Sequence, residues 1–235
     1  MKYLDDNIGV MGADSADDST TASGLLEHRI AELEVQIIEL PAGHAPRDKA
    51  KIQNDLARTL LELQRNEEAW DMAREAFDVF VADEDWESAV LACESMYESD
   101  QAESLPALGQ GIWLAVTFPI DPELSVAMLQ HVVDETPDES DGAALSAAVA
   151  HYIADLRSEG KQKEELQFFT GKLLAAVARR HSEVDTQEQF SLWMEKLELN
   201  DPKKFLPRMR NVVDVLVQES WWIDRDALWS KLPVN

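Results

Sequence analysis

Apolar residues recur with the period of an α-helix along almost the whole chain from residue 23 onward, and this pattern restricts the fold more than any other feature. Within residues 23–40, apolar side chains return every three or four positions, from Leu25 to Leu40, which predicts an amphipathic helix. No segment has the sustained polar–apolar alternation of a β-strand. We therefore predict an all-α fold.

Ten further helices are expected, separated by short polar or proline-containing connections. Two begin at Asp-Pro pairs, Asp121-Pro122 and Asp201-Pro202, where the aspartate caps the helix and proline occupies its first turn. Asn66 is expected to cap a third. The predicted ranges are about 47–63, 66–82, 85–98, 102–117, 122–135, 143–158, 161–181 and 185–199, a helix from 202, and a short helix after Asp224.

The first 22 residues differ from the rest of the chain. Residues 1–22 mix Asp, Ser, Thr and Gly without apolar periodicity, which predicts a flexible acidic tail, and residues 23–235 are expected to form a single all-α domain with helical repeats. The early acids do not resemble a secretory signal, and no apolar run approaches the roughly 20 residues of a membrane-spanning helix. We expect a cytoplasmic protein that does not engage a membrane.

The overall charge limits the kinds of partner. There are 21 Lys and Arg against 46 Asp and Glu, which leaves a net charge of -25 and argues against binding to nucleic acid or anionic lipid. The single cysteine excludes an intramolecular disulfide and a Cys-based zinc site.

The acids are concentrated in the middle of the chain. Residues 75–156, called here the base-free stretch, contain 18 Asp and Glu and no Lys or Arg. Such a zone repels itself, and a basic partner surface would relieve the repulsion. The alternative is a strongly solvated surface without a partner. The predicted contact residues are Asp83, Glu84, Asp85, Glu87, Asp100, Glu103, Asp134, Glu135, Asp138 and Glu139.

One segment carries a family resemblance. Leu56, Ala57 and Leu60 occupy packing positions of one helix, and Ala69 and Ala76 are small residues that would let a second helix approach it closely. With the turn between them, this pattern over about 50–83 resembles a tetratricopeptide repeat, a helix–turn–helix unit of about 34 residues. Residues 149–166 contain a looser copy.

The resemblance implies antiparallel helical hairpins stacked as a right-handed array, with a concave groove that binds a protein segment. Lys51, Asn54 and Arg58 would then project towards the groove. The alternative is an irregular helical bundle in which these three are ordinary surface residues.

The carboxyl-terminal part is rich in tryptophan and locally basic. Trp221 and Trp222 are adjacent, so their indoles point to different sides of the chain; they either contact a partner or belong to a last helix that caps the stack. Lys203, Lys204, Arg208 and Arg210 either dock against the acidic zone of a second copy, giving a homo-oligomer, or form a solvated helix face.

No catalytic or cofactor template is complete. Gly109-Gln110-Gly111 is the nearest approach to a phosphate-binding loop but lacks the remaining glycines. His131 with Asp134 and Glu135, and His151 with Asp155, have helical ligand spacing, yet surface or core roles are expected for both histidines. Cys93 is expected in the core. The sequence therefore predicts no enzyme, no cofactor and no metal ligand.

These observations favour a non-enzymatic adaptor or scaffold whose acidic central face engages a basic or apolar surface of a protein partner. Two alternatives remain: an assembly or maturation chaperone for an enzyme subunit, and an all-α enzyme with a dispersed site.

Overall fold

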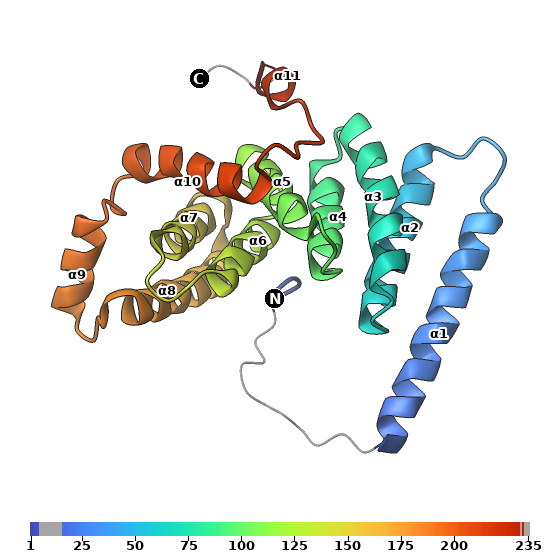
Figure 1. The fold of residues 1–235 in the computed structure, drawn as a ribbon, viewed down its shortest axis with the longest axis horizontal. Helices are drawn as coiled ribbons and strands as arrows, with labels where there is room; N and C mark the ends of the chain where they lie inside the picture. Colours follow the sequence, from blue (N-terminus) through green and yellow to red (C-terminus); the bar gives the residue numbers. More distant parts are fainter. Residues whose placement is uncertain (5–15, 231, 233–235) are drawn as a thin grey trace.

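The structure is a computed structural model that describes residues 1–4, 16–230 and 232, and these residues contain eleven helices and no strand. The prediction of an all-α fold is therefore confirmed for the described chain (Figure 1). The helices are α1 (Ala16–Ile38), α2 (Pro46–Glu62), α3 (Asn66–Ala82), α4 (Trp86–Glu98), α5 (Ser104–Thr117), α6 (Pro122–Glu135), α7 (Asp141–Arg157), α8 (Gly160–Ser182), α9 (Gln187–Lys196), α10 (Pro202–Val217) and α11 (Arg225–Ser230).

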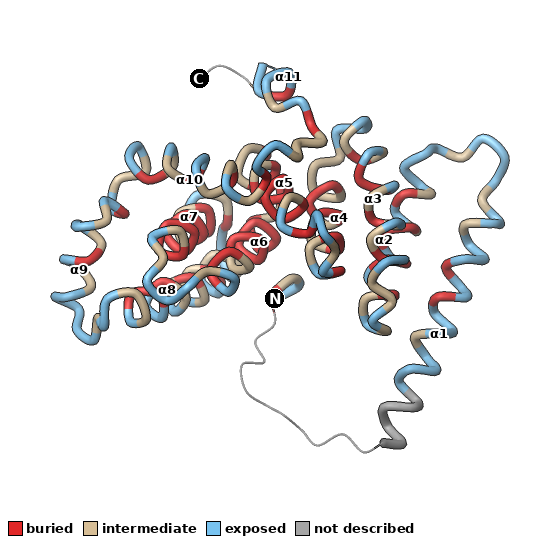
Figure 2. Tube along the Cα trace, viewed as in Figure 1, coloured by how far each residue is buried: buried red, intermediate tan, exposed pale blue. Residues whose placement is uncertain are grey.

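Helices that follow one another in the sequence also lie side by side. From α1 to α9 each helix contacts the next, and contacts of α2 with α4, α4 with α6 and α6 with α8 link every second helix. The even-numbered helices α2 to α8 thus form one layer, against which α3, α5 and α7 pack. Buried residues concentrate in α5, α6 and α7, at the centre of this arrangement (Figure 2).

Small side chains make the close packing possible. Ala69, Ala73 and Ala76 of α3 have no exposed surface, and Phe77 from the same helix is completely buried beside them. Because alanine adds little bulk, neighbouring helices approach closely and bury the larger side chains fully. The predicted positions of Ala69 and Ala76 at a helix–helix contact agree with this packing.

The connections α2–α3 and α3–α4 are short because the helices end in the same way. After α2, Gln64 adopts a left-handed conformation with φ of 58°, and the next amide, Arg65 N, donates to Leu60 O at 3.0 Å. After α3, Glu84 has φ of 56° and Asp85 N donates to Phe80 O at 2.9 Å. These are Schellman ends, which satisfy free carbonyls and reverse the chain within a few residues.

The predicted caps are partly confirmed. Asp121 accepts a hydrogen bond from Glu123 N, and Asp201 accepts one from Lys203 N, as expected for Asp-Pro starts. Asn66 is not a cap: α3 begins with Asn66 itself, and Arg65 precedes it without a side-chain capping bond. The Schellman end of α2 already positions this turn, so no side-chain cap is required.

Helix α10 returns the chain to the middle of the stack, where it packs against α5 and α7. A Cβ on Gly109 of α5 would lie 2.9 Å from Leu216 Cβ and 2.5 Å from Val217 Cγ2 of α10. The completely buried Gln110 accepts a hydrogen bond from Trp222 N at 2.7 Å. Gly109-Gln110-Gly111 is therefore a helical packing segment rather than a phosphate-binding loop.

The amino-terminal region has two parts: the first residues contact α6, and helix α1 begins before its predicted start. Leu4 is buried, and the amides of Tyr3 and Leu4 both donate to Glu123 Oε1 of α6, at 2.5 and 3.1 Å. Helix α1 begins at Ala16, seven residues before the predicted start at 23. The rest of the predicted flexible tail, residues 5–15, lies outside the described residues.

Candidate functional site

The predicted acidic residues separate into two groups, one at the turn that precedes α4 and one where α4 and α6 end. At the α3–α4 turn, two of the carboxylates make contacts within the chain. Asp85 pairs with Arg47 at 2.6 Å and accepts hydrogen bonds from Ser88, and Glu87 accepts the amide of Asp121 at 3.4 Å. Asp83 and Glu84 are exposed on the same turn. Asp85 and Glu87 therefore make contacts within the chain.

The second group surrounds a surface hollow of about 520 Å³ where α4 and α6 end, called here the acidic hollow. The Tyr97 hydroxyl donates to Glu135 Oε1 at 2.6 Å and so connects the last turns of the two helices. The hollow is lined by Tyr97, Glu98, Asp100, Gln101, Ala102, Ser104, Leu105 and Glu135. The exposed acids Glu103, Asp134, Asp138 and Glu139 belong to the same helix ends and connections.

Most carboxylates around the acidic hollow form no ion pair within the described residues. Within the described part of the chain, Asp78, Asp85, Glu94, Asp141 and Asp155 of the base-free stretch form ion pairs. None of Asp100, Glu103, Asp134, Glu135, Asp138 and Glu139 belongs to that set. Arg180 of α8 supplies one positive charge to the end of α6, donating to Val133 O at 2.5 Å.

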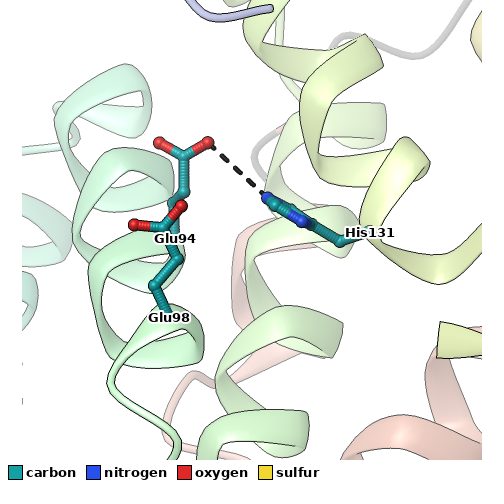
Figure 3. A group of neighbouring side chains, drawn as sticks. All are labelled: Glu94, Glu98 and His131. Atoms are coloured by element: carbon teal, nitrogen blue, oxygen red, sulfur yellow. Dashed lines mark ion pairs between the residues drawn. The ribbon is translucent and has the colours of Figure 1, made fainter. Parts of the chain in front are cut away.

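A second cluster lies on the facing sides of α4 and α6. Glu94 and Glu98 are one helical turn apart on α4, and one oxygen of each lies within 4.8 Å of the other and of a ring nitrogen of His131 on α6. Figure 3 shows both carboxylates beside the imidazole. Glu98 also lines the acidic hollow, so the two features are adjacent.

The surroundings of this cluster disfavour the charged form of Glu98. Burial raises the pKa of Glu98, and repulsion by Glu94 raises it further, whereas His131 and Arg58 act in the opposite direction. The Nε2 atom of His131 is buried without a hydrogen-bond partner, and Glu94 Oε1 lies 3.8 Å from it. That distance is too long for a hydrogen bond. The cluster therefore has donor atoms that the protein itself leaves unsatisfied.

From the sequence, His131 was considered together with Asp134 and Glu135, and a surface or core role was expected for the histidine. Asp134 and Glu135 share its helix, yet Glu94 and Glu98 from α4 face the ring. The spacing of Glu94 and Glu98, four residues apart in a predicted helix, was a signal that both lie on one face. Their partner could not be inferred, because the contact depends on how α4 packs against α6.

The predicted groove residues on α2 have different positions. Lys51 and Arg58 are exposed, and Arg58 is close enough to Glu98 to influence its charge. Asn54 is only 6% exposed, which corrects its expected place on the open surface. It is enclosed because α2 packs against both α3 and α4.

The carboxyl-terminal residues Trp221 and Trp222 pack against aromatic side chains of the same chain. Trp222 packs edge-on against Trp70 and Phe77, with ring centroids 6.0 and 5.8 Å away. Trp221 contacts Trp113 and the guanidinium of Arg225. Both tryptophans therefore pack against other parts of the chain, whereas Trp229 of α11 is 63% exposed.

Three of the four basic residues on α10 also make contacts within the chain. Lys204 pairs with Glu198 at 2.7 Å, Arg208 donates to Leu197 O at 2.6 Å, and Arg210 lies 3.6 Å from Asp214. Lys203 is exposed.

The other histidine candidate has a structural position. His151 Nδ1 lies 2.9 Å from Thr170 Oγ1, which connects α7 to α8, and Asp155 pairs instead with Lys163 at 2.9 Å. Cys93 is completely buried, as expected of a core residue, and burial raises the pKa of its thiol.

We expect His151 to make the fold sensitive to mild acid. Burial lowers its pKa, so the folded protein binds this proton more weakly than the unfolded chain does. Its contribution to stability is therefore present above the unfolded pKa of about 6.5 and is lost as the pH falls below that value. In His151→Gln, urea unfolding should show a smaller loss of stability between pH 7.5 and pH 5.5 than in the wild type. An equal loss in both proteins would contradict this role.

No protein-family model, curated protein or solved structure matches this chain significantly. Among the described residues, no helix has the length and apolar character needed to cross a membrane.

Proposed function

We propose that this protein is a non-enzymatic adaptor or scaffold that binds a basic segment of a protein partner at the acidic hollow. The observation that carries the proposal is the difference between the acidic residues of the α3–α4 turn and those around the acidic hollow. At the α3–α4 turn, Asp85 and Glu87 are engaged in internal contacts, whereas six exposed carboxylates around the hollow have no ion pair within the described chain.

The direction of the helices supports the same location. Both α4 and α6 end at the hollow, and the carboxyl-terminal end of a helix carries a partial negative charge. Neither helix has a Lys or Arg in its last turn, and Arg180 is a single compensating contact at α6. The carboxylates therefore add to the negative potential of the helix ends, and a cationic segment would lower the energy of both.

The arrangement of helices supports a binding role. We interpret the hairpins α2–α3, α4–α5 and α6–α7 as units of a tetratricopeptide-like stack, because each hairpin packs on the next and the even-numbered helices touch in succession. In such stacks the surface formed by one helix of each unit is used for binding. Arg58, Glu98 and His131 lie on α2, α4 and α6, so they belong to that surface.

The proposal predicts salt-dependent partner binding that depends on the hollow and not on net charge alone. Tagged full-length protein would be incubated with extract of its native source at about 0.05 M salt and eluted in steps to about 0.5 M, where charges more than roughly 4 Å apart are screened. The hollow variant carries Asp100→Asn, Glu103→Gln, Glu135→Gln and Asp138→Asn. A matched control removes four exposed charges elsewhere, with Glu183→Gln, Glu188→Gln, Glu195→Gln and Glu219→Gln.

We expect a stoichiometric partner on the wild type and the control, with at least tenfold less on the hollow variant, because several charge pairs are lost together. Equal recovery on all three proteins would exclude the hollow as the binding surface. Equal loss from both variants would mean that net charge, rather than this surface, retains the partner. Isothermal titration with the purified partner then measures the difference in Kd.

A further inference from the structure

We propose that Glu94, Glu98 and His131 form a binding site for a divalent transition-metal ion. This site does not require the protein partner proposed above, although Glu98 also lines the acidic hollow, and it is defined by the convergence of three donor groups from two helices. Glu94 and Glu98 extend from one face of α4, and His131 faces them from α6 (Figure 3).

The first argument is the unsatisfied imidazole nitrogen. His131 Nε2 is buried and has no hydrogen-bond partner in the structure, while its nearest ion-pairing oxygen, Glu94 Oε1, is 3.8 Å away. Buried polar nitrogens normally have a partner, so an orphaned one facing carboxylates indicates that a group belongs between them. A metal ion accepts the imidazole lone pair and both carboxylates at once.

The second argument is distance. Zinc binds histidine nitrogen and carboxylate oxygen at about 2.0–2.2 Å, so two ligands of one ion lie at most about 4.4 Å apart. The three donor atoms already lie within 4.8 Å of one another. Closing the remaining gap requires rotation of the glutamate side chains, which have several rotatable bonds.

The third argument is the donor set and its charge. One imidazole and two carboxylates suit zinc, manganese or iron(II), and the two carboxylates balance a divalent charge. The side chains of Glu94 and His131 are 13% and 24% exposed, so the site is partly shielded while Glu98 borders the acidic hollow. Three protein donors leave a coordination position for water from that side.

Neighbouring aromatic contacts hold the imidazole in place. The Tyr97 ring lies 4.7 Å from the His131 ring, centroid to centroid, and the Tyr97 hydroxyl is anchored on Glu135. This packing restricts the ring so that Nε2 faces α4, which reduces the entropy lost when a ligand binds.

Metal titration of the full chain tests the proposal. After treatment with EDTA and its removal, ZnCl2 would be added at pH 7.5 in about 0.5 M NaCl, which screens weak binding to the many surface acids. Isothermal titration should give one zinc per chain, and Co²⁺ should produce a visible absorption band. His131→Gln and Glu98→Gln should each weaken zinc binding at least tenfold and abolish the cobalt band.

Two controls make the result decisive. Glu103→Gln removes an exposed acid beside the adjacent hollow and should keep the zinc affinity within about twofold, and circular dichroism confirms that every variant is folded. Zinc should also raise the Tm of the wild type but not that of His131→Gln. Equal binding by wild type and His131→Gln, or no stoichiometric binding by the wild type, would overturn the proposal, since a simple histidine–carboxylate ion pair would bind no metal. Neither result bears on partner capture, which is measured with the hollow variant.

Discussion

Replacing Phe77 with alanine should lower the free energy of unfolding by about 3–5 kcal/mol, the range for removing a buried aromatic ring. Phe77 has no exposed surface and contacts Trp222 edge-on, so it connects α3 to the carboxyl-terminal segment. Its loss leaves a cavity and removes the surface against which Trp222 packs. For a domain of this size, each kcal/mol corresponds to a fall in Tm of about 2–4 °C. Urea and thermal unfolding followed by circular dichroism measure both quantities.

The matched control is Phe168→Ala on α8. Its ring is 66% exposed, so the same chemical change should alter stability by no more than about 0.5 kcal/mol. If the two variants are equally stable, α3 does not form a packed core with the carboxyl-terminal segment in solution.

Introducing a single methyl group at Gly109 should also be costly, with Gly109→Ala reducing stability by about 1–3 kcal/mol. The added Cβ would meet Leu216 Cβ at 2.9 Å and Val217 Cγ2 at 2.5 Å. The valine methyl has some freedom to rotate, but the Leu216 Cβ is attached directly to the backbone, so α10 must shift away from α5. Denaturant unfolding measures the loss of stability.

Gly171→Ala on α8 should instead increase stability. A Cβ there has no atom within 4 Å, and alanine is favoured over glycine inside a helix by about 1 kcal/mol. The two Gly→Ala variants should therefore change stability in opposite directions. Stabilisation by both would mean that α10 does not lie closely against α5.

The carboxyl-terminal segment is the structural element that these two predictions share. Gln110, next to Gly109, accepts the Trp222 amide, and Trp222 packs against Phe77. Segments that are more than a hundred residues apart in the sequence thus meet at one place, where α10 and the following residues cover α3 and α5. This closure partly buries Trp221 and Trp222, which sequence reasoning alone could assign either to a cap or to a partner.

Helix positions were largely predictable because they depend on local interactions. The α3 range of 66–82 is reproduced, and Asp121 and Asp201 cap the helices that they were expected to cap. Hydrophobic periodicity, proline geometry and capping all act within about four residues, so they can be inferred from neighbouring letters. The early start of α1 at Ala16 was missed because its first turns have little apolar pattern.

The candidate site was much less predictable. The absence of Lys and Arg between Arg74 and Arg157 indicated an acidic zone. It did not indicate that Asp85 would pair with Arg47 while Glu135 and the acids near it would form no ion pair with any described residue. Likewise, Asn54 was expected at the surface and is buried, since its exposure depends on how closely α4 approaches α2.

The sequence by itself determined an all-helical chain, the approximate span of its helices and the acidic character of its middle, because periodicity, caps and charge are properties of residues near one another. Only the tertiary structure decided that Glu94 and Glu98 face His131, that Gly109 lies against α10, and which acids gather around the hollow. These contacts join distant segments, and they depend on the directions and distances at which whole helices pack.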